Sequence, residues 1–329
     1  MKAWLLAGTV LLATLFSACG GTQAETSGDK REEQQGMEQQ AFTVDTPIEQ
    51  VMEDPAFGNY GRLLFPVNQG HYSGDTLGEL QLTYYSHIDP EKTVEIANYL
   101  KDRALAGQTV FYDIYTPEEK AQDPAKENTG LFFFKGEPGE KFAVCNAGGA
   151  FAYVGAMQDS FPHALELSKK GYNAFALIYR PGAQTACEDL ARAITFIFEH
   201  AEELEVDTDC YSLWGGSAGA RMAAWLGTYG PSAFGGGDLP QPGAVIMQYT
   251  GLSDYSAEDP PTFACVGDND GIANWRAMQA RLDALSALGV PTEFHHYPGL
   301  GHGFGLGTGT AAEGWLDLAV QFWEEQMES

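Results

Sequence analysis

The chain has 329 residues, with 45 Asp and Glu against 18 Lys and Arg, and therefore a formal net charge of −27. This balance excludes nucleic acid as the natural partner, because phosphate backbones are bound through clustered Lys and Arg that the composition lacks. Apolar residues make up 44% and charged residues 19% of the chain. These shares exclude a mostly disordered protein and predict one globular domain of about 250 residues with further segments attached.

The first segment, residues 1–18, has the pattern of an export signal. Lys2 precedes an apolar run from Ala3 to Phe16, which is short for a hydrocarbon core of roughly 30 Å. Leu15-Phe16-Ser17-Ala18-Cys19 resembles the bacterial lipobox, in which the cysteine receives a diacylglyceryl group after cleavage. We expect an exported protein held at the outer face of the bacterial cell membrane through a lipid on Cys19 alone. An ordinary signal peptide cut nearby is the alternative.

Two further segments precede the main domain. Residues 19–41 contain no apolar side chain larger than one Met, so they predict a disordered, solvated tether. Residues 42–108 mix aromatic residues with Gly, Pro and Asn, and we expect an extension packed on the main domain. Within it, Leu80–Tyr85 predicts a strand, and Asp89 with the following proline predicts the start of a helix that ends near Gly107.

Residues 109–329 alternate strands with amphipathic helices, which predicts an α/β fold with about eight mostly parallel strands and helices on both faces. Functional residues of such sheets collect at the carboxyl ends of the strands. The expected strands are Val110–Tyr115, Leu131–Phe134, Phe142–Cys145, Ala174–Tyr179, Cys210–Trp214, Ala244–Tyr249, Thr262–Val266 and Thr292–Tyr297. The expected helices are Phe161–Lys170, Cys187–Ala201, Ala218–Tyr229, Asn274–Leu288 and Gly314–Gln326.

The cysteines after Cys19 predict free thiols. Cys145 and Cys265 each end an apolar run, where a thiol packs as a small hydrophobic group. A bridge between Cys187 and Cys210 is the alternative. No spacing suggests a zinc site, and we expect neither a metal nor an organic cofactor.

A candidate nucleophile follows the strand Cys210–Trp214, in the sequence Gly215-Gly216-Ser217-Ala218-Gly219. The Gly-x-Ser-x-Gly pattern is weak by itself, but a strand before it and a helix after it are the context that a nucleophile elbow requires. A sharp turn of this kind exposes Ser217 at the helix N-terminus, and small neighbours let the backbones pass closely. A glycine-rich turn before a buried helix is the structural alternative.

A serine hydroxyl needs a base, and His302 is the candidate because it lies in a glycine-rich loop directly after the last expected strand. His295 and His296 lie within that strand, and the other four histidines precede the serine. The acid partner follows the preceding strand in Gly267-Asp268-Asn269-Asp270. We select Asp270, which is further past the strand end. Asp268 and Asp254 remain the alternative acids.

The oxyanion of a tetrahedral intermediate needs hydrogen-bond donors, which are usually backbone amides. Gly148 and Gly149 follow the strand ending at Cys145 and let the chain approach a ligand closely. Together with the amide of Ala218 they form the predicted oxyanion hole. A loop of glycines chosen only for a tight bend is the alternative.

The segment from about residue 109 to 326 resembles an α/β-hydrolase of the esterase and lipase group, nearest to its acetyl-esterase or xylan-esterase-like members. The resemblance is carried, in order, by NAGGAF, GYNAFALIYRPG, the helix beginning at Asp189, GGSAG, GDND and GLGHGFG. It implies Ser217 as nucleophile, Asp270 as acid, His302 as base, and Gly148, Gly149 and Ala218 at the oxyanion hole. Asn146 departs from the group, which usually has histidine there.

The resemblance implies a serine carboxylesterase, and the 53-residue interval from Ser217 to Asp270 leaves little room for a cap domain. An open site favours short acyl groups, and export favours substrates outside the cell, with acetylated polysaccharide fragments as one candidate. The expected partner is thus a small-molecule or oligosaccharide ester. Two other functions stay open: a serine peptidase of the prolyl-oligopeptidase type, and a binding lipoprotein without catalysis.

Overall fold

The computed structural model describes residues 40–85 and 88–328. The predicted export signal, Cys19 and nearly all of the predicted tether lie outside the described residues. The chain from Ala41 onward forms one compact unit. Within the two described ranges, no helix combines the length and apolar character needed to cross a membrane.

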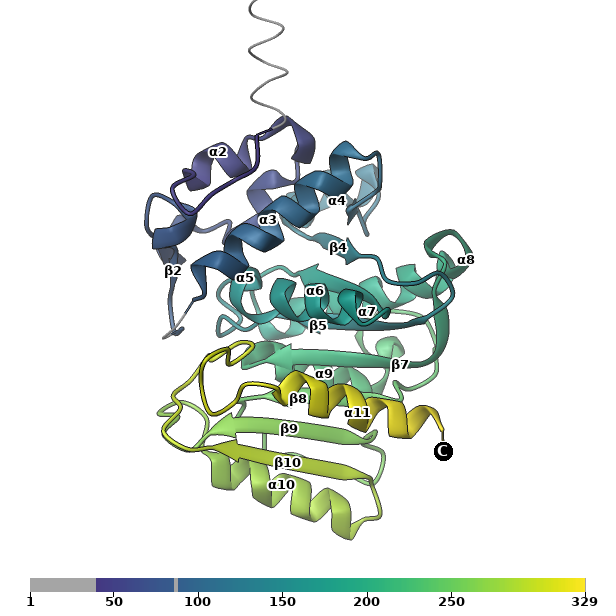
Figure 1. Cartoon of the computed structure of the whole chain (residues 1–329). Helices are drawn as coiled ribbons and strands as arrows, with labels where there is room; N and C mark the ends of the chain where they lie inside the picture. The colour runs from purple at the N-terminus through teal and green to yellow at the C-terminus, as the bar shows by residue number, and fades with distance from the viewer. Residues whose placement is uncertain (1–39, 86–87, 329) are drawn as a thin grey trace, which may run out of the picture. The chain divides into compact units, whose positions relative to one another are not determined.

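An eight-stranded sheet runs through this unit in the order β10-β9-β8-β7-β5-β6-β4-β3 (Figure 1). The strands from β10 to β6 are parallel, whereas β4 runs antiparallel to β6, and β3 antiparallel to β4. The predicted sheet of eight mostly parallel strands is therefore confirmed. The strands are β3 Phe111–Tyr112, β4 Gly130–Phe134, β5 Lys141–Asn146, β6 Asn173–Ile178, β7 Asp207–Gly216, β8 Ala244–Gln248, β9 Thr262–Gly267 and β10 Thr292–Tyr297.

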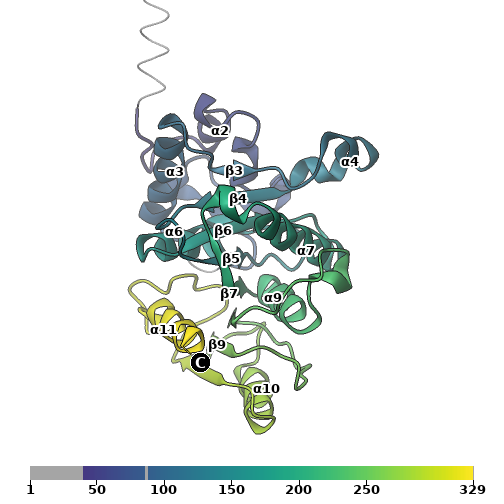
Figure 2. The ribbon, with the colours of Figure 1, turned by 90° about the vertical axis from the view of Figure 1, so that its right-hand side faces the viewer.

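Helices cover both faces of the sheet, as the view along its strands shows (Figure 2). One face is covered by α6 (Phe161–Lys169) and α11 (Trp315–Met327), and the other by α7 (Ala183–Glu199), α9 (Ala218–Tyr229) and α10 (Trp275–Ala287). The parallel strands β6, β8 and β9 are buried at every position, because a parallel sheet covered on both sides has no solvent-facing side.

The extension before the sheet consists mostly of short elements. Its longest helix, α3 (Pro90–Leu105), begins as predicted at Asp89, whose side chain accepts the N–H groups of Glu91 and Lys92. Its other elements are α2 Ile48–Met52, η1 Pro55–Phe57, η2 Gly61–Leu64, η3 Gln69–His71, η4 Leu77–Glu79 and the two-residue strands β1 Tyr72–Ser73 and β2 Gln81–Leu82. Apolar side chains of the extension join the same core as the sheet, among them Phe57, Leu64, Leu77 and Leu100.

Several predicted boundaries differ from the structure. The strand predicted over Leu80–Tyr85 is only β2, because the chain turns at Tyr84, which has a φ of 75°. The strand predicted over Val110–Tyr115 is only β3, which pairs with β4 at two positions. Within residues 109–328, the elements not predicted are all short: α4 Pro117–Gln122, η5 Pro124–Asn128, α5 Ala156–Asp159, α8 Ala201–Leu204 and η6 Pro231–Phe234.

The cysteines of the described residues are free thiols, as predicted. Cys187 and Cys210, the pair left open, are both unbridged. Burial raises the pKa of the Cys187 thiol to about 12, so this thiol stays protonated and packs as an apolar group.

A buried ion pair anchors the extension internally and provides a test of its stability. The ammonium of Lys101 lies 2.8 Å from a carboxylate oxygen of Asp54, and their side chains are 3% and 6% exposed. We expect Asp54→Ala to lower the free energy of unfolding by about 3–5 kcal/mol, because it removes the carboxylate that neutralises the buried ammonium of Lys101. Urea denaturation measures this loss. The matched control is Asp207→Ala, which breaks the more exposed pair with Lys141 and should cost about 1 kcal/mol or less.

Candidate active site

Ser217 occupies a sharp turn between a strand and a helix. Strand β7 ends at Gly216 and α9 begins at Ala218, and Ser217 itself has a φ of 52°, in a region that residues with a side chain rarely adopt. A β-carbon on Gly219 would overlap the carbonyl oxygen of Asn146, and one on Gly215 would overlap the backbone of Gly219. Close backbone contacts therefore leave room only for glycine at these two positions. The turn keeps Ser217 in a strained conformation, as the motif predicts.

Substitution of one of these glycines tests how tightly the turn is packed. We expect Gly219→Ala to cost about 3 kcal/mol of unfolding free energy and to displace Ser217, because the neighbouring backbone cannot yield. A displacement of about 1 Å is sufficient to lower turnover roughly 100-fold. Gly271→Ala is the control, since open space surrounds that glycine. Equal melting temperatures and activities for the two variants would contradict the prediction.

The structure brings Ser217, His302 and Asp270 together in one hydrogen-bonded row. The hydroxyl oxygen of Ser217 lies 3.0 Å from Nε2 of His302, and Nδ1 of His302 lies 2.8 Å from Oδ2 of Asp270. The side chains of His302 and Asp270 are 7% and 0% exposed. Water is thus excluded from the imidazole and carboxylate, which strengthens the interaction between them.

The other oxygen of Asp270 fixes the carboxylate in place. Oδ1 accepts the backbone N–H groups of Ile272 and Ala273, each at 2.7 Å. Asp268, one of the two alternative acids, instead accepts the N–H of Gly299 at 2.6 Å and stabilises that turn. The carbonyl of Asp254 accepts from the side chain of Arg281. Of the three candidate acids, Asp270 is the one placed on His302.

The loop that carries His302 is held by side chains that the sequence did not identify. The carbonyl of Gly303 accepts from the amide of Gln158 at 3.0 Å. The carbonyl of Gly305 accepts from Gln248 at 2.9 Å and from the indole of Trp315 at 3.0 Å. A glycine-rich segment loses much conformational entropy when it becomes ordered, and these hydrogen bonds offset that cost.

The predicted oxyanion donors need one correction. The N–H of Gly148 donates to Oδ2 of Asp159 at 3.1 Å, so this amide is occupied by a carboxylate and does not face a substrate. The amides of Gly149 and Ala218 donate to no acceptor among the described residues. Gly149 has a φ of 131°, and a β-carbon there would overlap the carbonyl oxygen of Tyr153, so the position requires glycine. The available donors are therefore those of Gly149 and Ala218.

Asp159, a fully buried carboxyl group at the end of α5, was also missed by the sequence analysis. Burial raises its pKa, whereas hydrogen bonds from Tyr249, Tyr85 and Gly148 oppose that rise. Nothing in its local sequence distinguishes Asp159 from a surface residue, since it follows no strand of the sheet.

His163 is a buried histidine whose role is structural. Its Nε2 lies 2.8 Å from the side-chain oxygen of Gln248, whose backbone carbonyl accepts the N–H of Ser217. Burial lowers the pKa of His163 to about 4, so its ring is neutral at physiological pH. It therefore supports the turn beneath Ser217 without adding a charge.

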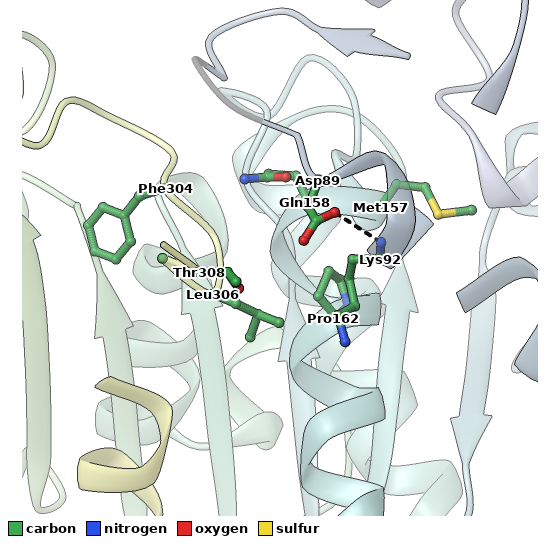
Figure 3. A pocket seen from close by; sticks show the side chains of 9 residues that line it. Asp89, Lys92, Met157, Gln158, Pro162, Phe304, Leu306 and Thr308 are labelled. Atoms are coloured by element: carbon green, nitrogen blue, oxygen red, sulfur yellow. Dashed lines mark hydrogen bonds between the residues drawn. The ribbon is translucent and has the colours of Figure 1, made fainter. Parts of the chain in front are cut away.

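A small pocket lies beside the loop that follows His302 (Figure 3). Its volume of about 20 Å³ is close to the space that one water needs, so it is too small for an acyl group. The residues that line the pocket include Phe304, Leu306 and Thr308 from the loop and Asp89, Lys92 and Pro162 facing them.

Among the described residues, no three His, Cys, Asp or Glu side chains form a group able to hold a metal ion.

One family model matches part of the chain. The BD-FAE family model matches residues 137–281, a range that contains Ser217 and Asp270 and ends before His302. No protein of curated function matches the chain in sequence.

Three solved structures illustrate the likeness in fold. An acetyl ester-xyloside bifunctional hydrolase from Caldicellulosiruptor lactoaceticus is 22% identical with a TM-score of 0.57, and the match covers 65% of this chain and 95% of that one. The α/β-hydrolase MGS-M1 from a Medee basin deep-sea metagenome is 20% identical with a TM-score of 0.52, covering 61% and 93%. Esterase 2 of Thermogutta terrifontis, phosphorylated by paraoxon, is 21% identical with a TM-score of 0.51, covering 60% and 88%. The chain has the α/β-hydrolase fold.

Proposed function

We propose that this protein is a serine carboxylic ester hydrolase that acts through an acyl-enzyme on Ser217. The observation that carries the proposal is the hydrogen-bonded row from Ser217 through His302 to Asp270, built on a strained turn. The family match and the esterases among the structural neighbours support the same class of reaction.

The proposed reaction has two steps. Ser217 attacks the ester carbonyl while Nε2 of His302 takes its proton, and His302 then passes that proton to the departing alcohol. A water molecule, deprotonated by the same ring, next attacks the acyl-enzyme. The bond between the acyl carbon and the Ser217 oxygen then breaks, His302 returns its proton to that oxygen, and the acid is released. Asp270 holds Nδ1 of His302 and stabilises the imidazolium, and the amides of Gly149 and Ala218 donate to the oxyanion of each tetrahedral intermediate.

For the substrate, we propose short acyl esters outside the cell, with acetylated carbohydrates as the first class to test. Between Ser217 and Asp270 the described chain consists of α9, η6, β8, β9 and their loops, which supports an open site. The neighbour from Caldicellulosiruptor lactoaceticus is described as an acetyl ester-xyloside hydrolase, which supports the carbohydrate class by analogy.

A chain-length series of p-nitrophenyl esters, together with acetylated xylo-oligosaccharides, tests this proposal. We expect kcat/KM to be highest for acetate and to fall from butyrate to octanoate, because an open site encloses little of a long chain. A maximum at octanoate would contradict the short-acyl assignment. No release from any ester would contradict the ester hydrolase itself.

The two other functions give different results in the same assays. A peptidase of the prolyl-oligopeptidase type would cleave a peptide anilide faster than p-nitrophenyl acetate. A binding lipoprotein would leave Ser217 unlabelled by a fluorophosphonate probe. We expect labelling at Ser217 and no cleavage of the anilide.

For location, we propose export and attachment to the outer face of the cell membrane through a lipid on Cys19. The support is the lipobox-like sequence Leu15-Phe16-Ser17-Ala18-Cys19. Expressed in a bacterium, the full chain should fractionate with membranes, and Cys19→Ala should remove it from them. Equal membrane association of both forms would contradict the anchor.

A further inference from the structure

Asp159 is a buried carboxyl group that the proposed reaction does not use, although it lies beside the reacting groups. A β-carbon on Gly216, the residue before Ser217, would overlap its carboxyl group. A β-carbon on Gly148 would lie 2.8 Å from Cβ of Ser217 and 2.9 Å from Oδ2 of Asp159. The carboxyl group therefore packs against the backbone at the base of the candidate nucleophile.

Neighbouring donors supply hydrogen bonds to both oxygens of the Asp159 carboxyl group. Its Oδ2 accepts from the hydroxyl of Tyr85 at 2.6 Å and from the N–H of Gly148 at 3.1 Å. Its Oδ1 accepts from the hydroxyl of Tyr249. The Tyr249 hydroxyl oxygen also accepts the N–H of Gly305 at 3.3 Å, which leaves its proton for Asp159. Three donors converge on a group that has only acceptors when ionised.

Each donor to Asp159 also contacts part of the catalytic machinery. The ring of Tyr249 packs edge-to-face on the ring of His302, with centroids 4.9 Å apart. The ring of Tyr85 lies so close to Gly303, the residue after His302, that a β-carbon there would touch it. Gly148 immediately precedes Gly149, the proposed oxyanion donor. One carboxylate thus joins the loop of His302 to the oxyanion loop.

We propose that Asp159 is a positioning residue of the ester hydrolase, holding His302 through Tyr249 and Tyr85 and the oxyanion loop through Gly148. This inference rests on the function proposed above. The titratable groups that interact electrostatically with Asp159 are Tyr85, Tyr153, Tyr179, Tyr249 and His302.

The inference gives the N-terminal extension a part in the reaction. Tyr85 belongs to the extension, while Asp159, Gly148 and Gly303 belong to the sheet domain. A residue that precedes the sheet by some 25 positions in the chain thus completes the surroundings of the candidate triad. Burial raises the pKa of Tyr85 well above its ordinary value, so its hydroxyl keeps the proton that it donates.

The test compares Asp159→Asn and Tyr85→Phe with the wild-type chain, using p-nitrophenyl acetate across a range of pH. We expect Asp159→Asn to lower kcat about 100-fold and to change KM less than about threefold, because positioning acts on the transition state. A general collapse of the site would instead raise KM together with the loss of kcat. Tyr85→Phe should lower kcat about tenfold.

Tyr115→Phe is the matched control, because the Tyr115 hydroxyl donates to another buried carboxylate, Asp189, at 2.7 Å. It should keep wild-type kcat and KM. Asp159→Asn that keeps kcat, or that raises KM as strongly as it lowers kcat, overturns the inference. If Asp159→Asn does not fold by circular dichroism, Tyr85→Phe decides, and wild-type kcat in that variant overturns the inference. A wild-type chain inactive on every ester would instead contradict the proposed function.

Discussion

Replacing Ser217 with alanine is expected to lower kcat for p-nitrophenyl acetate by about 10⁵–10⁶-fold while leaving the fold intact. The hydroxyl lies 3.0 Å from Nε2 of His302 and is the atom that would form the acyl-enzyme. Alanine removes that atom and keeps the β-carbon, so the strained turn and its packing remain. A residual rate over water should persist, because the amides of Gly149 and Ala218 still stabilise an oxyanion.

Two measurements separate this loss from other causes. A fluorophosphonate probe should label the wild-type chain at residue 217 and leave Ser217→Ala unlabelled. Ser286→Ala, at an exposed serine near the end of α10, should keep wild-type activity and labelling. Turnover by Ser217→Ala within tenfold of the wild type would show that another group is the nucleophile.

The candidate triad could be predicted from sequence because each member follows a strand of the sheet. Ser217 follows β7, Asp270 follows β9 and His302 follows β10, and parallel strands bring their carboxyl ends to one edge. The local pattern of each strand is strong, and the chain order of serine, acid and histidine restricts the choice further. The choice of Asp270 over Asp268 and Asp254 depended on turn conformations that sequence describes poorly.

The surroundings of the triad could not be predicted in the same way. Asp159 ends a four-residue helix, and Tyr85 lies in an extension without a regular hydrophobic period. Their meeting depends on how a long irregular segment packs on the sheet, which no local propensity encodes. The error at Gly148 has the same origin, because the acceptor of its N–H is Asp159. The short strands β2 and β3 also depend on conformation beyond the local pattern: β2 ends before the turn at Tyr84, and β3 pairs with β4 at only two positions.

The second large effect is expected for Asp270→Asn, which should lower kcat about 10⁴-fold with little change in stability. Oδ1 of Asp270 accepts two backbone N–H groups at 2.7 Å. In the asparagine variant, the single side-chain oxygen must take the place of Oδ1 to keep these two bonds. The amide NH₂ must then face Nδ1 of His302. A donor at that position needs an acceptor, so it selects the tautomer in which Nδ1 carries no proton.

That tautomer places the ring proton on Nε2, where it faces the hydroxyl of Ser217 and prevents the ring from accepting the serine proton. The variant should therefore recover activity as pH rises and hydroxide takes over the role of the base. Asp268→Asn is the matched control, because Asp268 bonds the N–H of Gly299 and not the imidazole. We expect it to keep kcat within about threefold of the wild type, since the turn it stabilises tolerates a neutral acceptor. The reverse ranking of the two variants would assign the acid to Asp268.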